Sequence, residues 1–265
     1  MNPSGGINMT HNKLRYFVTL SALCAIVFVL GMTPLGIIPI GFINVTILCI
    51  PVIVGTVLMG LKGGLVLGAC FGLSSTLRAF GIPTPPSALV AGLMAESPFS
   101  VIVMSMLPRL CVPVVTWLVY RLITRRGERL FPETPLAKVA DSIIFIIAFP
   151  AAFILLYAFH VIPFAWTLGA FLFFIGFELI FAGRGDSFSM ILSSAAGSMT
   201  NTVLYLSLML VFYKAAGIES NEVLALIKGT GIIAGGLEAM AAAVLTGPIV
   251  RALKAANLGF KEETL

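Results

Sequence analysis

The feature that most constrains this chain is a series of eight long apolar stretches separated by short polar segments. A helix needs about 20 apolar residues to cross a bilayer, and in lipid only helices and closed barrels satisfy every backbone hydrogen bond. The sequence therefore predicts an all-α integral membrane protein, a polytopic helical bundle forming one transmembrane domain over residues 1–265. The predicted spans lie near 16–32, 44–60, 63–80, 99–122, 142–160, 164–182, 188–212 and 232–250.

Composition excludes the soluble alternatives. Hydrophobic residues make up 59% of the chain and charged residues 10%, whereas soluble domains have about 45–50% and about 25%. A soluble enzyme, a disordered chain and a nucleic-acid-binding domain are thereby excluded. The phosphate-loop and zinc-protease motifs are missing, and the two histidines, His11 and His160, lie far apart in the sequence. We expect no catalytic residues, no metal site and no cofactor.

Basic residues indicate the orientation in the membrane. With a cytoplasmic N-terminus, twelve of them fall on the inner side, against three, Arg78, Lys214 and Lys228, on the outer side. Cytoplasmic loops carry such an excess of Lys and Arg, so both termini are predicted to be cytoplasmic. The inner residues are Lys13, Arg15, Lys62, Arg121, Arg125, Arg126, Arg129, Lys138, Arg184, Arg251, Lys254 and Lys261.

Two charged residues within predicted spans, Arg109 and Glu238, are the strongest functional signals. A charge at the centre of a bilayer costs about 2.5–3.5 kcal/mol on insertion scales and usually faces protein or water. Arg109 follows Pro108 about halfway along its span, and Glu238 lies in the outer half of the last span, which runs in the same direction. The two residues could form a buried salt bridge that stabilises the bundle, or they could contact a ligand directly.

Three further polar residues are candidates for an outer site. Arg78 ends the third span and either binds an anion through its guanidinium or extends to the membrane interface. Asn44 opens the second span, and Asn201 lies in the middle of the seventh, where an amide needs several hydrogen-bond partners. Prolines prevent segment 81–98 from being a regular helix throughout, so it is a candidate outer lid. Segment 33–42 is predicted to be a second irregular outer loop.

Small residues recur at helical contact spacing in two places. Ser21 and Ala25 lie in the first span, and Gly64, Gly68 and Gly72 lie in the third. Residues four apart form a smooth strip that another helix can approach closely. For the glycine strip, contact within the chain is the favoured interpretation. For Ser21 and Ala25, periodicity alone leaves both an internal and an intermolecular contact open.

A set of short motifs, in their order and spacing, resembles the substrate-binding S components of energy-coupling factor (ECF) vitamin transporters. The resemblance covers residues 15–123 and 187–254. The motifs are GMTPLG at 31–36 with Ile38-Pro39, NVT at 44–46 leading to IPVIVG at 50–55, LPR at 107–109, GSMTNT at 197–202, Glu238-Ala239 and IVRALK at 249–254.

This resemblance implies a protein of a prokaryotic plasma membrane that captures a vitamin-like molecule near the outer face. It implies docking onto a transmembrane coupling subunit and two ABC ATPases, with Ser21 and Ala25 in the place of the strip that meets the coupling subunit. The common core has six helices, so the resemblance also implies an additional helix pair at 138–182. Alternatively, one of those two stretches replaces a standard helix.

The residues and the resemblance together suggest an outward-opening pocket. Its predicted lining is Asn44, Arg78, Arg109, Asn201 and Glu238. Two arginines favour a carboxylate-bearing ligand, and the lack of Trp and Tyr in this lining argues against a stacked flavin, so pantothenate is favoured over folate and riboflavin. The alternatives are a self-sufficient secondary transporter, which would couple to an ion through intramembrane carboxylates, and a membrane-embedded enzyme, which would need a nucleophile–base pair or a metal cluster.

Overall fold

The computed structural model describes residues 4–40, 43–83, 85–130, 187–217, 221 and 232–260. In this part of the chain five helices are long and apolar enough to cross a membrane. The predicted pair at 142–160 and 164–182 lies outside the described residues, so the choice between six and eight spans stays a prediction, as does the cytoplasmic side of both termini. The five helices are α1 (Ser4–Met32), α2 (Cys49–Ala79), α4 (Pro98–Leu130), α7 (Ser187–Ala215) and α9 (Ile232–Ala255).

The element α2 consists of two helices that turn back on each other at Gly60. The backbone of Gly60 has φ 75° and ψ −173°, a conformation that is essentially restricted to glycine. A Cβ on Gly55 would lie 2.1 Å from Cδ1 of Leu67, although twelve residues of continuous helix would separate the two by about 18 Å. The chain therefore reverses at Gly60. This agrees with the separate helices predicted at 44–60 and 63–80, except that the first begins at Cys49.

A small β ribbon between α1 and α2 adds two short strands to the predicted helical bundle. After a 3-10 turn at Pro34–Gly36, β1 (Ile37–Ile40) pairs antiparallel with β2 (Ile43–Thr46), with Pro39 opposite Asn44. The segment 33–42 is thus more regular than predicted, and residues 44–46 are strand instead of helix. β-branched residues favour strands, but in an apolar sequence so short a strand has no periodicity that distinguishes it from a helix.

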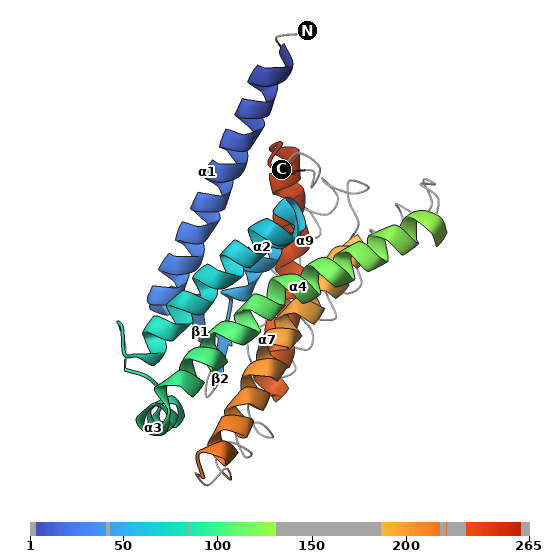
Figure 1. Ribbon diagram of the computed structural model, residues 1–265. Coiled ribbons are helices and arrows are strands. Elements are labelled where there is room, and N and C mark those ends of the chain that lie inside the picture. Colours follow the sequence, from blue (N-terminus) through green and yellow to red (C-terminus); the bar gives the residue numbers. More distant parts are fainter. Residues whose placement is uncertain are drawn as a thin grey trace.

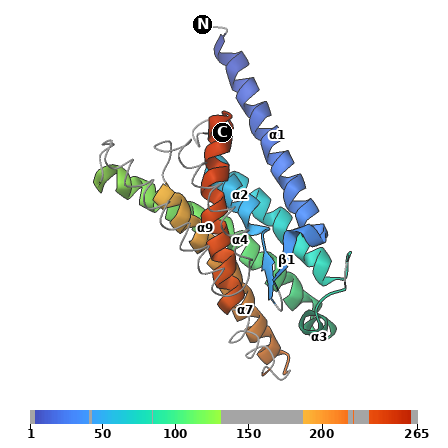
Figure 2. The same cartoon turned by 180° about the vertical axis from the view of Figure 1, so that it is seen from behind.

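The helices form a bundle in which α2, α4, α7 and α9 enclose a common core, while α1 packs on α2 at the edge (Figures 1 and 2). The core between them holds Ile53, Leu58, Phe71, Val112 and Ala242. The two helices of α2 run side by side with α4, and α7 lies between α4 and α9. This arrangement brings the middle of α4 and the middle of α7 toward the start of α2.

The glycine strip of α2 lies in a helix contact inside the chain. A Cβ on Gly64 would lie 2.9 Å from Cβ of Pro113, and one on Gly68 would lie 2.7 Å from the backbone oxygen of Arg109. A Cβ on Gly72 would lie 2.7 Å from Sδ of Met106. All three neighbours are on α4, so the intramolecular interpretation of this strip is confirmed.

The proline-rich segment after α2 is helical only in part, as its prolines predict. It contains α3 (Ala88–Glu96), which is capped by the Ser87 side chain and interrupted at Ser97 before α4 begins. Leu93 packs with Val101 of α4 and Met209 of α7 in a second core cluster. The segment thus covers one end of the bundle, and its movement as a lid stays a prediction.

Two helices extend beyond their predicted ends. α1 begins at Ser4 instead of residue 16. α4 continues to Leu130, eight residues beyond the predicted end of this span at residue 122. Arg121 stacks on the ring of Trp117, with its guanidinium carbon 4.7 Å from the ring centroid. Arg is a good helix former and this pair lies one turn apart, so charged residues continue the helix beyond the apolar span.

Candidate functional site

The side chain of Arg109, in the middle of α4, is held by a carbonyl that the preceding proline leaves without a donor. Pro108 has no N–H, so the carbonyl of Met104, four residues earlier, lacks its helical donor. The Nη1 of Arg109 donates to this carbonyl at 3.0 Å. The guanidinium carbon lies 4.6 Å from the ring centroid of Tyr205 and 5.4 Å from that of Phe71. The LPR motif thus directs a cation across the bundle onto aromatic rings of α7 and α2.

Glu238 joins three elements that are far apart in the sequence. Its Oε1 accepts a hydrogen bond from the backbone N–H of Thr46 at 2.9 Å, and its Oε2 accepts one from Oγ1 of Thr202 at 3.0 Å. The residue is buried, with 9% of its surface exposed. These bonds connect α9 to β2 and α7, and they give the carboxylate the partners that a buried charge requires.

Asn201 is buried on α7 beside the residues that contact Arg109 and Glu238. It precedes Thr202, the partner of Glu238, and lies one helical turn before Tyr205, the partner of Arg109. Its Oδ1 has no hydrogen-bond donor in the part of the chain that the structure describes. An unpaired buried amide oxygen is uncommon, so Asn201 presents an open acceptor.

These contacts define a polar cluster at the centre of the bundle. Arg109 lies within electrostatic range of Glu238 and Cys49, but among the described residues no ion pair joins Arg109 to Glu238. Of the two alternatives that the sequence left open, the salt bridge is therefore not formed among the described residues, and each charge has separate partners. The polar cluster consists of Thr46, Arg109, Asn201, Thr202, Tyr205 and Glu238.

The other two predicted site residues lie at different positions. The backbone of Asn44 lies in β2, two residues before Thr46. Arg78 is half-buried in the last turn of α2, seven residues beyond Phe71 and hence about 10 Å further along the helix. No hydrogen bond or ion pair of the Arg78 side chain is formed within the described residues. The structure thus brings together Arg109, Asn201 and Glu238, places Asn44 two residues before Thr46, the partner of Glu238, and leaves Arg78 apart.

Sequence reasoning missed the aromatic wall of the cluster. Tyr205 and Phe71 face Arg109, so the argument against a stacked flavin from a lack of Tyr no longer holds. The spacing of Asn201 and Tyr205, four residues apart on one helix face, could have indicated Tyr205. The donor from Thr46 could not be found in this way, because it is a backbone N–H and has no signature of residue type.

Ser21 and Ala25 are exposed on the outer side of α1. The same face carries the exposed apolar residues Phe17, Val18 and Val29. Helix α1 packs through its opposite side, where Val27 is fully buried. The strip is therefore not used in packing among the described residues, and its surface is available to lipid or to a partner.

Comparison with known proteins assigns the chain to a family. A search of curated proteins finds no match to the chain. The family model described as "ECF transporter, substrate-specific component" matches residues 15–250, a range that contains the whole polar cluster and most of each of the five apolar helices. Proteins of this family serve transport by binding the substrate and are not enzymes, and they work with an ECF module. The chain therefore belongs to the family of ECF transporter substrate-specific components, and it is the multi-pass membrane subunit that binds the substrate.

Proposed function

We propose that this protein captures a small, vitamin-like molecule bearing a carboxylate at Arg109, Asn201 and Glu238. It then delivers the molecule to a coupling module made of a transmembrane coupling subunit and two ABC ATPases. The observation that carries the proposal is a pair of buried polar atoms that lack protein partners. They are Nε of Arg109, a donor, and Oδ1 of Asn201, an acceptor, and neither has a hydrogen-bond partner in the described residues.

The two atoms specify complementary ligand chemistry. An unsatisfied buried polar group costs about 1–3 kcal/mol, so a ligand that satisfies both groups gains affinity from a site that is already folded. Arg109 would donate to a ligand carboxylate, and Asn201 would accept from a ligand hydroxyl or amide N–H. In its ionised form Glu238 would orient the ligand by repelling its carboxylate and accepting from its hydroxyl groups.

Pantothenate has a carboxylate, hydroxyl groups and an amide N–H, and it is our first choice of ligand. Folate and riboflavin follow, because the rings of Tyr205 and Phe71 could also stack on an aromatic ligand. In this proposal Arg78 attracts the anion at the outer end of α2, and Asn44 lies on the ribbon that closes the site. No cofactor takes part, since capture and delivery leave the substrate chemically unchanged.

Delivery requires a surface that the coupling subunit can reach. The exposed strip of Ser21 and Ala25 offers a smooth face on a helix that packs against few other elements. Small residues let a second helix approach closely in lipid. We assign this face to contact with the coupling subunit. The protein would lie in the prokaryotic plasma membrane, with both termini on the cytoplasmic side, where the ATPases act.

The test is thermal unfolding of the purified protein in detergent with a panel of B vitamins, their precursors and free bases. A ligand at 100 times its Kd stabilises the folded state by about 2.7 kcal/mol. We expect pantothenate to give such a shift. Arg109→Gln and Asn201→Ala should each weaken binding at least tenfold, about 1.4 kcal/mol.

The matched controls are Arg121→Gln, on the same helix as Arg109, and Thr200→Ala, next to Asn201. Thr200 donates to the carbonyl of Ala196 within its own helix, so both controls should bind like the wild type. If Arg109→Gln and Asn201→Ala fold and retain wild-type affinity, the site is wrong. Cellular uptake that persists without any ATPase module would contradict the delivery step and favour a secondary transporter.

A further inference from the structure

A second site lies at the opposite end of the bundle from β2 and α3. It is a pocket of about 540 Å³ formed where α1, the turn of α2, α4, and the end of α9 with the segment after it meet. Tyr120 lies eleven residues beyond Arg109 on α4, about 16 Å along the helix, so this pocket is separate from the polar cluster. It is lined by Arg15, Val57, Leu58, Tyr120, Lys254, Asn257, Gly259 and Phe260.

Backbone contacts build the floor of this pocket. The chain turns after α9 at Asn257, which has φ 60°, and the N–H of Leu258 donates back to the carbonyl of Leu253 at 2.9 Å. The N–H of Phe260 then donates to the carbonyl of Leu58 at 3.1 Å, at the turn of α2. These bonds fix the segment after α9 against α2, so the pocket is a formed feature of the fold.

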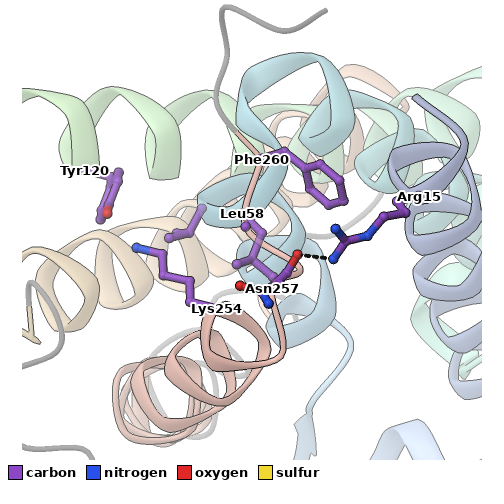
Figure 3. A pocket seen from close by; sticks show the side chains of 8 residues that line it. Arg15, Leu58, Tyr120, Lys254, Asn257 and Phe260 are labelled. Carbon is purple, nitrogen blue, oxygen red and sulfur yellow. Dashed lines mark hydrogen bonds between the residues drawn. The ribbon is translucent and has the colours of Figure 1, made fainter. Parts of the chain in front are cut away.

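Side chains from α1 complete the wall. Arg15 donates to the carbonyl of Asn257. The rings of Tyr16 and Phe260 meet edge to face, with centroids 5.3 Å apart. Figure 3 shows Arg15 and Lys254 on opposite sides of Leu58 and Asn257, with the guanidinium of Arg15 pointing toward Asn257 and the amino end of Lys254 on the side of Tyr120. The pocket therefore has a basic group on each side and an apolar floor between them.

The lining is amphipathic, and the described residues contribute no acidic side chain to it. Arg15 and Lys254 contribute positive charge, and Tyr120 and Asn257 contribute polar groups, whereas Val57, Leu58 and Phe260 are apolar. A guanidinium has five N–H donors, so Arg15 keeps several after its bond to Asn257. This combination suits an anion attached to an apolar body.

We propose that this pocket binds the phosphate headgroup of an anionic phospholipid. The phosphate oxygens would accept from Arg15 and Lys254, and the glycerol and first acyl carbons would lie along Leu58 and Phe260. A volume of about 540 Å³ falls within the range of small-molecule sites, about 300–1,000 Å³. Basic pockets between helices on the cytoplasmic side suit acidic lipid headgroups, and this end is the one predicted to be cytoplasmic.

The probes are phosphatidylglycerol and phosphatidylcholine of the same acyl length, added to the full-length protein in detergent. Lipid adducts are counted by native mass spectrometry and stabilisation is followed by thermal unfolding. We expect the wild type to retain phosphatidylglycerol at least tenfold better than phosphatidylcholine, whose choline cation is repelled by the pocket. Lys254→Gln should lose this selectivity, and Arg15→Gln should lose it too, while Arg15→Lys keeps part of it.

The control is Lys62→Gln, because Lys62 is exposed near the turn of α2 but does not line the pocket. Lys254→Gln leaves the bond between Arg15 and Asn257 in place, so it decides the question if Arg15→Gln fails to fold. Equal binding of the two lipids overturns the proposal. So does a loss of selectivity in Lys62→Gln as large as that in Lys254→Gln, because it indicates that diffuse surface charge attracts the lipid. Equal stabilisation by inorganic phosphate or glycerol 3-phosphate assigns the pocket to a soluble phosphate compound and rejects the lipid.

Discussion

The two strips of small residues have the same spacing and opposite surroundings. Gly64, Gly68 and Gly72 of α2 are covered by α4, whereas Ser21 and Ala25 of α1 are exposed. Of the most apolar window of each helix, 61% is buried inside the protein in α2 and 17% in α1. The spacing of small residues thus makes a helix surface smooth, but the position of the helix in the bundle decides whether another helix of the same chain covers that surface.

The largest expected effect is on protein stability, which a bulky substitution should lower in the buried strip and leave unchanged in the exposed strip. Gly68→Leu forces a side chain against the backbone oxygen of Arg109 and the ring of Pro113, and neither can move without bending α4. We expect a loss of about 3 kcal/mol, at the upper end for an overpacked core. Ala25→Leu should change stability by less than about 0.5 kcal/mol, as exposed positions do. Thermal unfolding of both variants in the same detergent checks this, and similar losses would abolish the distinction.

The second effect concerns assembly and has the opposite pattern. Ala25→Leu roughens the exposed strip, so it should weaken association with the coupling subunit at least tenfold, about 1.4 kcal/mol. Titration of the two purified subunits in lipid nanodiscs measures this. Ile26→Phe is the control, because Ile26 is also exposed but lies about 100° around the helix from Ala25. Wild-type association of the Ala25→Leu variant would remove this strip as the docking face.

The smallest expected effect is a difference in stability between two substitutions within the buried strip. A methyl group on Gly72 meets Sδ of Met106, the flexible end of a side chain that can move away. We expect Gly72→Ala to lose no more than about 1 kcal/mol, and Gly68→Ala to lose more, because its neighbour is backbone. Chemical denaturation in mixed micelles ranks the two variants. If Gly72→Ala is the more damaging, the contact with α4 is tighter at Met106 than the structure indicates.

Most of the helical frame could be predicted from the sequence, because apolar length is a direct requirement of the bilayer. The charged residues Arg109 and Glu238 were also identified, since a charge in an apolar span needs a reason. Their neighbours were harder to find. The bond from Arg109 to Met104 depends on a carbonyl released by Pro108, and the bond from Thr46 to Glu238 depends on a backbone N–H.

The ribbon and the turn of α2 are two features that local sequence patterns do not fully predict. Residues 37–46 are apolar and β-branched within a membrane sequence, so nothing in their pattern separates a short strand from the start of a helix. The two predicted helices around Gly60 were separated correctly, yet their side-by-side packing follows from contacts such as that of Gly55 with Leu67. Single-sequence periodicity describes one helix face at a time and does not say which faces meet.

The bond between Thr46 and Glu238 has a consequence for how the protein is made. The two residues are 192 positions apart, and helices leave the ribosome in chain order. While α9 is still being synthesised, the N–H of Thr46 and the hydroxyl of Thr202 lack their common acceptor, although α1 and α2 can already pack. The hydrogen bonds of Glu238 in the polar cluster thus form only after α9 has been made, so a chain that stops before α9 lacks the acceptor that joins β2 to α7.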